Sequence, residues 1–383
     1  MSIPKEPAFS VGEYRRRVAL VHGKLKERGL DAIVLFGPHN INYLTGMDSE
    51  NLFDPQACIL AAGNDPVLVV FDFERGRFEN SSWLADPVLY GGFEDPIAAF
   101  ARAITERGLG RARLGVEQRS IGTQQYAKFL AALPQAQIDD AFGVVESVRL
   151  VKGPEEIALM RQAAALTDRG VAAGFAAIAE GRRDYEVAAA IAGALYSGGS
   201  ELVSFGPIVA AGYRAGLAHS AHSGHRLATG ETVFLELTGQ CRRYTAPLMR
   251  TAVTGKASAE QRRLADASGD AVAAILETAK AGTPACTVAE AGLKYIAPVE
   301  QGIVFHHYFG YPIGLGYPPS WIEALGFFLR VDNPTPLRAG MVFHLPISLR
   351  VAGRFGICLS HSMLVTEQGG VALTQSPARL VEL

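Results

Sequence analysis

Two neighbouring apolar segments place the strongest constraint on how this chain folds. Residues 232–238 and 243–253 both have the composition of β-strands, and the short loop between them favours an antiparallel pair. The first segment contains Glu236, a carboxylate in an otherwise apolar run. A buried carboxylate is costly unless it is paired. Glu236 therefore either forms an ion pair with Arg243 or Arg250 of the neighbouring strand, or it serves a chemical purpose.

The length and charge of the chain limit the classes of function. With 383 residues, the chain is long enough for two domains with separate cores. Its hydrophobic share of 49% and its charged share of 19% are typical of globular proteins. A formal net charge of -2 supplies no broad field for nucleic acid or for an anionic membrane. We therefore expect a small-molecule partner, no nucleic-acid partner and no membrane partner.

The cysteines and the N-terminal residues favour a cytoplasmic location. The four cysteines lie far apart and include no Cys-x-x-Cys pair: Cys58, Cys241, Cys286 and Cys358. This pattern is typical of reduced thiols and not of a zinc or disulfide framework. The first residues are polar and lack the apolar core of a signal peptide. No run of about 18 apolar residues is present to span a membrane.

The first part of the chain alternates between helical and strand patterns. Val11 to Arg28 has apolar residues at helical spacing and stops at Gly29. Further segments are expected as strands at 32–36, 57–61 and 67–71 and as a helix at 95–107. This alternation predicts an α/β domain over residues 1–150.

The pattern changes at Pro154, which opens a helix with acidic residues in its first turn. Long helices follow, with strand pairs between and after them. The expected helices cover about 155–178, 184–196, 258–280 and 288–298, and the expected strands cover 204–212, 232–238, 243–253, 341–351 and 355–365. Helices segregated from antiparallel strands predict an α+β layered domain over residues 151–383.

Five landmarks occur in an order that matches one protein family. They are Asn42–Gly46, Arg149–Glu156, Phe205–Gly212 ahead of His219, Glu236–Thr251 and Gly340–Phe343. On these residues the chain resembles the creatinase/aminopeptidase P/prolidase family, whose catalytic domain has the pita-bread fold. The resemblance implies a creatinase-like α/β N-terminal domain at 1–150 and an α+β pita-bread catalytic domain at 151–383. It also implies a homodimer, with the loop at 48–54 as our candidate for a contribution to the partner's site.

Metal-dependent members of this family bind two divalent ions through two aspartates, one histidine and two glutamates. The resemblance places these five ligand positions at Glu236, Pro247, Tyr311, Pro346 and either Ser360 or His361. Only Glu236 keeps a carboxylate, so we expect no metal site and no cofactor. An alternative site formed by His344, His361 and Cys358 on facing strands remains open.

Metal-free branches of the family cleave C–N bonds in small polar molecules. Creatinase-like members carry a glutamate just before the Arg-Thr of the hairpin, where this chain has Met249. The segments Glu236–Gly239, Arg243–Thr251 and Gly310–Pro319 resemble the ectoine-hydrolase branch, which usually has a glutamate where this chain has His361. The resemblance implies a metal-independent hydrolase acting on a small polar cyclic amidine, lactam or amide, zwitterionic substrates included. The alternatives are an Xaa-Pro-type metallopeptidase with relocated ligands and a catalytically dead pita-bread binding protein.

Glu236 and His219 are the predicted catalytic residues. Burial in an apolar strand would raise the pKa of Glu236, which suits a general base that activates water or a nucleophile that attacks the substrate carbon. His219 stands where the family places a substrate-contacting histidine, and the titration of histidine near neutral pH suits proton transfer to a leaving nitrogen. The alternative role for Glu236 is the structural ion pair described above.

Five residues are predicted to bind the substrate: Tyr244, Tyr311, Tyr317, His344 and His361. The tyrosines of the glycine-rich segment 310–319 offer phenol groups to a small ligand, and core packing would explain them equally well. His344 alternates with apolar neighbours, which indicates a strand with one polar face. His306, His307 and Trp321 are expected at the rim of the same site.

Overall fold

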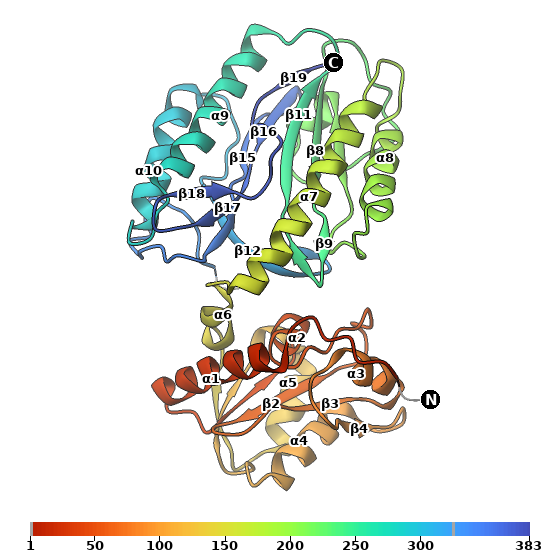
Figure 1. The fold of residues 1–383 in the computed structure, drawn as a ribbon, viewed down its shortest axis with the longest axis vertical. Helices are drawn as coiled ribbons and strands as arrows, with labels where there is room; N and C mark the ends of the chain where they lie inside the picture. Colours follow the sequence, from red (N-terminus) through yellow and green to blue (C-terminus); the bar gives the residue numbers. More distant parts are fainter. Residues whose placement is uncertain (1–2, 324–325) are drawn as a thin grey trace. The chain divides into compact units, whose positions relative to one another are not determined.

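The computed structural model describes residues 3–323 and 326–383, and the chain divides after Arg149 into two compact units (Figure 1). The second unit begins at Leu150 and contains all of the predicted site residues. Among the described residues, no helix is long and apolar enough to cross a bilayer.

The N-terminal unit is built on a six-stranded mixed sheet with the strand order β4-β3-β2-β1-β5-β6. The strands are β1 (Ala32–Leu35), β2 (Ala57–Ala61), β3 (Val67–Phe71), β4 (Val88–Tyr90), β5 (Arg113–Val116) and β6 (Gln137–Asp140). The helices are α1 (Val11–Arg28), α2 (Pro38–Thr45), α3 (Arg75–Ser81), α4 (Pro96–Glu106), α5 (Thr123–Ala132) and α6 (Val144–Arg149). One apolar face of the sheet packs on α4 and α5, where Phe100 and Phe129 are fully buried.

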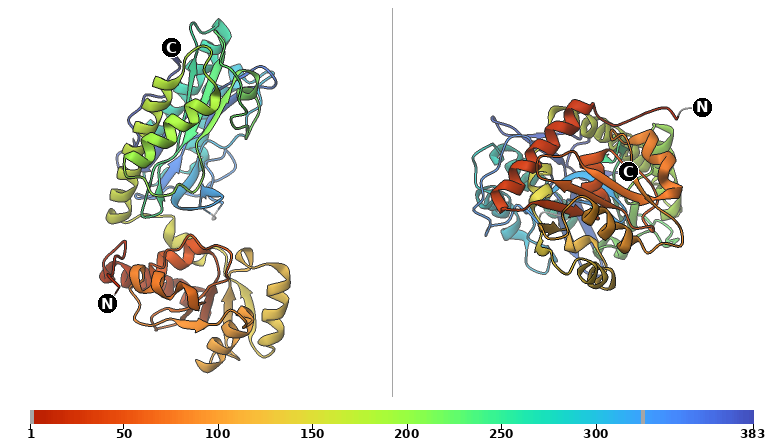
Figure 2. Two further views of the ribbon diagram at one scale, coloured as in Figure 1. Left: turned by 90° about the vertical axis from the view of Figure 1, so that its right-hand side faces the viewer. Right: turned by 90° about the horizontal axis from the view of Figure 1, so that it is seen from below.

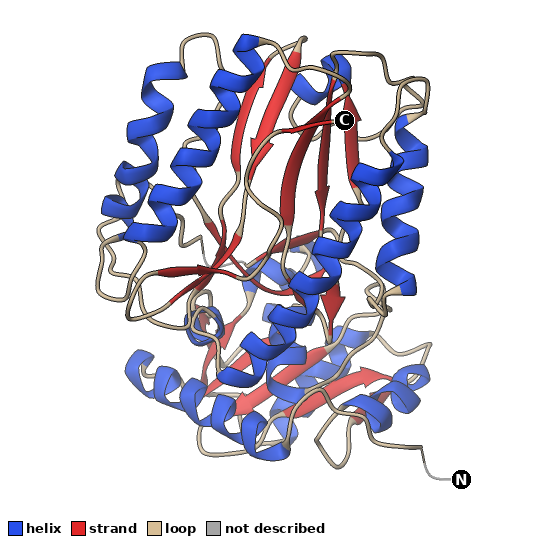
Figure 3. Ribbon diagram, turned by 45° about the horizontal axis from the view of Figure 1, so that its top comes forward, coloured by secondary structure: helices blue, strands red, loops and turns tan. Residues whose placement is uncertain are grey.

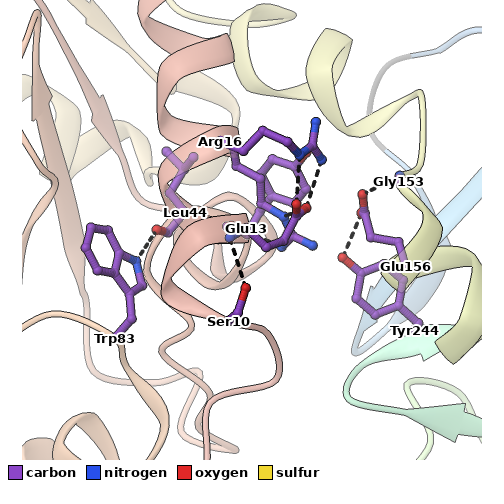
Figure 4. Close-up of polar contacts among 10 residues, drawn as sticks. Ser10, Glu13, Arg16, Leu44, Trp83, Gly153, Glu156 and Tyr244 are labelled. Carbon is purple, nitrogen blue, oxygen red and sulfur yellow. Dashed lines mark hydrogen bonds and ion pairs between the residues drawn. The ribbon is translucent and has the colours of Figure 1, made fainter.

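Helix α1 shows how the local sequence sets element boundaries. The Oγ atom of Ser10 caps it by accepting a hydrogen bond from the backbone N–H of Glu13 at 3.2 Å (Figure 4). The helix ends at Gly29, whose φ of 64° is readily adopted by a residue without a side chain. The predicted boundaries, Val11 and Arg28, are confirmed.

The strands of the C-terminal unit form a seven-stranded, a four-stranded and a two-stranded sheet. The largest has the order β18-β17-β14-β12-β10-β9 with β13 paired to β12, and the others have the orders β19-β11-β8-β7 and β15-β16. Their bounds are β7 (Ile208–Ala211), β8 (Thr232–Leu237), β9 (Gln240–Cys241), β10 (Tyr244–Thr245), β11 (Leu248–Val253), β12 (Tyr311–Tyr317), β13 (Ser320–Ile322), β14 (Val342–His344), β15 (Ile347–Val351), β16 (Phe355–Leu359), β17 (Ser362–Val365), β18 (Gly370–Ala372) and β19 (Val381–Glu382).

Two helix pairs cover these strands. Helix α7 (Pro154–Ala177) packs against α8 (Asp184–Ser197), and α9 (Ala259–Thr278) packs against α10 (Ala285–Ile296). The strands lie between the two pairs (Figures 2 and 3). Helix α7 contacts β8, β9 and β10, whereas α9 contacts β15, β16 and β18. This arrangement is the α+β layering that the sequence predicts for this part of the chain.

Three strands predicted as continuous are each interrupted near the middle. The segment 243–253 breaks into β10 and β11 at Pro247, 341–351 breaks into β14 and β15 at Pro346, and 355–365 breaks into β16 and β17 at Ser360-His361. The two halves of each segment belong to different sheets. Proline has no N–H to give to a ladder, which explains the first two corners. Three of the five predicted ligand positions, Pro247, Pro346 and Ser360, therefore lie at corners between sheets.

Strand β12 is a central strand that the sequence did not predict. Its glycines leave room for close neighbours, because a Cβ at Gly316 would lie 2.7 Å from Cγ2 of Thr245 and 2.8 Å from Oγ of Ser204. Glycine and proline weaken the strand pattern in a sequence, although here the tight packing requires the glycine. Helix α2 was likewise not predicted, and Pro38 occupies the first turn of that helix.

Candidate active site

The C-terminal unit contains a cavity of about 520 Å³ into which three of the seven predicted site residues project. These three are His219, Glu236 and Tyr311. The cavity wall is largely apolar, and its described aromatic residues besides Tyr311 are Phe205, Phe234, Phe305, Tyr308, Trp321 and Phe328. Besides these three, the polar residues on the described wall include His306, Ser320, Ser348 and Arg350. A few polar groups on a largely apolar wall are typical of a small-molecule site.

Glu236 is the carboxylate of this cavity. Strand β8 holds it between β7 and β11, and its Cα lies opposite Ile208 and Met249. Only 9% of the residue is exposed, and its carboxylate makes no hydrogen bond or ion pair with any described residue. Burial raises the pKa of Glu236 to about 7, and the positive charge of Arg350 partly opposes that rise.

The structural ion pair considered for Glu236 is not formed. The guanidinium of Arg250 donates to the carbonyl oxygens of Met249 at 2.7 Å and Ser360 at 2.6 Å, and it also donates to Ser376. The guanidinium of Arg243 lies 4.6 Å from the ring centre of Tyr317. Glu236 therefore carries an unpaired carboxylate in an apolar wall, which is the chemically costly arrangement.

Arg350 contributes the positive charge of the cavity. It lies on β15 and is only 6% exposed. Its Nε donates to Oγ of Ser348 at 3.0 Å and its Nη1 donates to the carbonyl oxygen of Ala215 at 2.7 Å, while the guanidinium stacks over Phe234 at 4.7 Å. These contacts fix the guanidinium without neutralising it. The cavity thus presents a buried cation and a buried anion that do not pair with each other.

Tyr311 reaches the cavity from β12, and hydrogen bonds on its far side hold it. Its hydroxyl oxygen accepts a hydrogen bond from Nε1 of Trp321 at 2.9 Å and lies 2.7 Å from Nδ1 of His344. Nε2 of His344 lies 2.8 Å from Oγ of Ser360, which also accepts a hydrogen bond from the backbone N–H of Met249 at 2.6 Å. Burial and the charge of Arg250 lower the pKa of His344 to about 3, so this imidazole is neutral.

Two histidines face the cavity in different settings. His219 is exposed and has a φ of 56°, an unusual backbone conformation for a residue with a side chain. Nδ1 of His306 accepts a hydrogen bond from the backbone N–H of Tyr308 at 3.0 Å. Desolvation, followed by repulsion from Arg350, lowers the pKa of His306 to about 4. His306 is therefore neutral near pH 7, and both histidines are exposed to solvent at the cavity.

The structure does not bring the other four predicted residues to the cavity wall. Tyr317 is buried under the guanidinium of Arg243, and the hydroxyl of Tyr244 donates to Glu156 at 2.8 Å (Figure 4). His344 lies behind Tyr311, and Nδ1 of His361 lies 2.8 Å from Oγ1 of Thr374. These four side chains support the strands and corners around the cavity, because each satisfies its polar group inside the protein.

Sequence reasoning missed Arg350 and Ser348. The signal was present, because these residues alternate with Ile347, Leu349 and Val351 and so mark a strand with one polar face. The segment was predicted as a strand, yet a polar face in a strand does not by itself tell whether it meets solvent or a cavity.

The donor set of the predicted ligand positions does not fit a divalent metal ion. Glu236 supplies one carboxylate, Tyr311 a phenol and Ser360 a hydroxyl that is engaged with His344, whereas Pro247 and Pro346 supply no side-chain donor. In the described part of the chain, no group of three or more His, Cys, Asp or Glu side chains is arranged to hold a metal. The alternative cluster around Cys358 fails for the same reason, since Cys358 lies 3.2 Å from Oγ of Ser348 and His361 contacts Thr374.

Comparison with known proteins identifies the family. Residues 158–367 match metallopeptidase family M24, and residues 17–151 match the creatinase/prolidase N-terminal domain. An uncharacterized hydrolase/peptidase, y4tM, of Sinorhizobium fredii is 31% identical over 97% of this chain and 98% of that protein. The ectoine hydrolase of Halomonas elongata is 27% identical over 97% of this chain and 98% of its own length.

A solved structure supports the same conclusion for the fold. The dipeptidase PepE from Mycobacterium ulcerans superposes with a TM-score of 0.83 at 25% sequence identity, covering 98% of this chain and 99% of that one. The predicted pita-bread domain and creatinase-like N-terminal domain are confirmed by these matches. The chain therefore belongs to metallopeptidase family M24 and is a two-domain hydrolase of that family.

Proposed function

We propose that this protein is a metal-independent hydrolase that cleaves a C–N bond in a small polar cyclic amidine, lactam or amide. The observation that carries the proposal is the state of Glu236, a buried and unpaired carboxylate with a pKa of about 7 on the wall of the cavity. A carboxylate with that pKa is half ionised near neutral pH, which is the condition for efficient general base catalysis. An unpaired buried charge has no structural benefit that would explain its presence.

The reaction follows from the placement of Glu236 and His219. The ionised carboxylate of Glu236 takes a proton from water as the water oxygen bonds to the electrophilic carbon of the substrate. The C–N bond then breaks, and the departing nitrogen receives a proton from His219 or from the protonated Glu236. The products are a carboxylate or amide and an amine, so one water is consumed and the proton count balances. No step in this scheme requires a metal ion.

Arg350 supports a substrate that carries an anionic group as well as the reacting C–N bond. A fixed guanidinium that lines the cavity favours a carboxylate in a charge-assisted hydrogen bond. The aromatic wall favours a compact ring or a cationic nitrogen. A zwitterionic cyclic amidine or an amide of an amino acid satisfies both conditions, and the relative from Halomonas elongata is named an ectoine hydrolase.

Removing divalent metal is expected to leave hydrolysis unchanged. The protein would be dialysed against EDTA, its residual metal measured by mass spectrometry, and its turnover compared for ectoine, small lactams and Xaa-Pro dipeptides. Turnover of a cyclic amidine, lactam or amide without stoichiometric metal supports the proposal. Hydrolysis of Xaa-Pro dipeptides only after Mn²⁺ is added back would instead establish a metallopeptidase with relocated ligands. Binding of these compounds without turnover would establish a binding protein.

Replacing Arg350 with glutamine is expected to raise KM by about 10–100-fold, since a hydrogen bond to a charged group is worth about 1.5–3 kcal/mol. Because Arg350 holds down the pKa of Glu236, its loss should also move the acid limb of the pH–rate profile to higher pH. The matched control is Arg354→Gln, which removes a guanidinium that pairs with the surface residue Glu260 at 2.8 Å. Equal KM values for the two variants would show that Arg350 does not contact the substrate.

A further inference from the structure

The hydrogen-bond chain behind the cavity has a direction that can be deduced from its donors and acceptors. It runs from the backbone N–H of Met249 through Ser360 and His344 to Tyr311, where Trp321 joins it. Two of its donors are unambiguous, because a backbone N–H and an indole N–H can only donate. The protons on the hydroxyl groups and on the imidazole follow from these two.

The hydroxyl of Ser360 determines the direction of its hydrogen bond with His344. The residue has no solvent exposure, and its Oγ has two partners in the described chain, the N–H of Met249 at 2.6 Å and Nε2 of His344 at 2.8 Å. If Nε2 donated, the hydroxyl hydrogen of Ser360 would be buried without an acceptor, which costs about 1–3 kcal/mol. The hydroxyl of Ser360 therefore donates to Nε2 and accepts from Met249.

The tautomer of His344 follows. The imidazole is fully buried next to the guanidinium of Arg250, and no carboxylate of the described chain contacts it, so it carries one proton. Since Nε2 accepts, that proton is on Nδ1. Nδ1 then donates to the hydroxyl oxygen of Tyr311 at 2.7 Å.

Tyr311 ends the chain at the cavity. Its oxygen accepts from Nδ1 of His344 and from Nε1 of Trp321, so both lone pairs of the phenol oxygen are used. We infer that the phenol of Tyr311 is held as a hydrogen-bond donor into the cavity, where it stabilises the negative charge that develops on the substrate during attack. His344 and Ser360 are positioning residues that act through it. This inference rests on the proposed hydrolase function for its chemistry, but the direction of the chain stands independently.

The arrangement gives the cavity a neutral hydrogen-bond donor at Tyr311. The resemblance assigns this position to the histidine ligand of the metal-dependent members. Two donors on a phenol oxygen increase the acidity of its O–H, and burial together with the charge of Glu236 keeps the pKa of Tyr311 well above its ordinary value, so the proton stays in place. A fixed, buried donor on a largely apolar wall is worth more than the same donor in water. Glu236 and Tyr311 then have complementary tasks, one accepting a proton from water and the other donating a hydrogen bond to the oxygen or nitrogen that becomes negative.

The direction of the chain is tested by the tautomer of His344, which needs no substrate. Protein labelled with ¹⁵N-histidine would be studied by long-range ¹H–¹⁵N correlation, with His344→Gln to assign the signal. The expected spectrum has a protonated Nδ1 and an unprotonated Nε2 at neutral pH. A protonated Nε2 with an unprotonated Nδ1 would mean that Tyr311 donates to His344, and it would overturn the inference even if the enzyme hydrolyses its substrate.

The catalytic role of Tyr311 is tested by the variant Tyr311→Phe. Its turnover is measured with whichever of ectoine, the small lactams and the Xaa-Pro dipeptides the wild type hydrolyses. Loss of one donor to a developing negative charge is expected to lower kcat by about 10²–10³-fold with little change in KM. The acid limb of the pH–rate profile, which reports Glu236, should remain. The matched control is Tyr90→Phe in the N-terminal unit, which removes a buried phenol hydrogen bond to the carbonyl oxygen of Pro55 at 2.8 Å. A kcat loss no larger than that of the control, or a loss confined to KM, would contradict a catalytic donor.

Discussion

Replacing Glu236 with glutamine is expected to abolish hydrolysis and, at pH 8, to make the protein more stable. The loss of activity follows because an amide cannot take a proton from water, and we expect kcat to fall by at least about 10³-fold, within the range seen when a general base is removed. The gain in stability follows because the variant no longer buries an unpaired charge. Few substitutions are expected to change activity and stability in opposite directions, so the combination is diagnostic.

The pH dependence of the wild type has a definite sign. Glu236 acts as a base only when it is ionised, so kcat should rise with pH through a limb at about 7. A pH–rate profile measured between pH 5 and pH 9 would check this. A profile that is flat across pH 7, or that falls as the pH rises through 7, would contradict the role of Glu236 as the base.

The ionisation of Glu236 has the opposite effect on stability: as the pH rises, kcat should increase while the free energy of unfolding decreases. The pKa of Glu236 is raised from 4.5 to about 7 in the folded protein, so the folded state binds more protons than the unfolded state between these values. The contribution of Glu236 to stability is therefore greatest below pH 4.5, and the burial cost of its charge grows as the pH rises from 4.5 to 7. At about 1.4 kcal/mol per pKa unit, the gain from Glu236→Gln should reach about 3 kcal/mol at pH 8 and should vanish towards pH 4.5.

A matched control separates this effect from any general effect of glutamine. Glu156 is also buried, but its carboxylate accepts hydrogen bonds from the hydroxyl of Tyr244 at 2.8 Å and from the backbone N–H of Gly153 at 2.9 Å (Figure 4). Glu156→Gln should lower the free energy of unfolding, measured by urea denaturation at pH 8, whereas Glu236→Gln should raise it. Destabilisation by both substitutions would show that Glu236 is a structural residue.

The fold was predictable where the signals that define a helix or strand are local in the sequence. Helix α1 and strands β2 and β3 begin and end at the predicted residues, because capping by Ser10 and Gly29 and uniform apolar runs are local signals. The corners at Pro247, Pro346 and Ser360-His361 were not predicted, since the change from one sheet to another depends on which neighbours pair with each half. The same non-local information placed the glycine-rich strand β12 in the centre of a sheet.

The site was predictable in part for a related physical reason. Glu236 stood out because a carboxylate in an apolar strand is anomalous in any context, and Tyr311 lies at a recognisable family position. Tyr244 lies on β10 and His361 at the corner between β16 and β17, and the direction of each side chain depends on strand register and on the corners. Thr374 and Glu156, which satisfy their polar atoms, are more than ten residues away in the sequence. Arg350 belongs to no motif, and only the packing of its guanidinium over Phe234 of β8 reveals its place at the site.

Replacing Lys152 with methionine is expected to cause the largest loss of stability. Nζ of Lys152 lies 3.0 Å from Oε2 of Glu323, and the two side chains are 0% and 3% exposed. Removing one partner of a buried ion pair leaves the other charge buried and typically costs about 3–5 kcal/mol. The pair packs over Gly314 of β12, where an added Cβ would meet Oε1 of Glu323 and would lie 3.0 Å from Cε of Lys152. The glycine thus provides the space in which the pair forms.

Loss of the Lys152–Glu323 ion pair should affect the active site as well as the stability of the fold. Glu323 follows Trp321 by two residues, and Trp321 both lines the cavity and donates to Tyr311. Lys152→Met should therefore lower the midpoint of urea denaturation and also reduce kcat. The double variant Lys152→Met/Glu323→Gln should recover most of the stability, because it removes the uncompensated charge as well.

The control for this pair is an ion pair of the same type on the surface. Nη2 of Arg262 lies 2.7 Å from Oε1 of Glu382, with side chains 51% and 40% exposed, and Arg262→Met should cost at most about 1 kcal/mol. A loss for Lys152→Met as small as that of Arg262→Met would show that solvent screens the Lys152–Glu323 pair. Burial of the pair beneath β12 predicts the opposite, because the strand that carries Tyr311 is held in place partly by a charge that has no access to water.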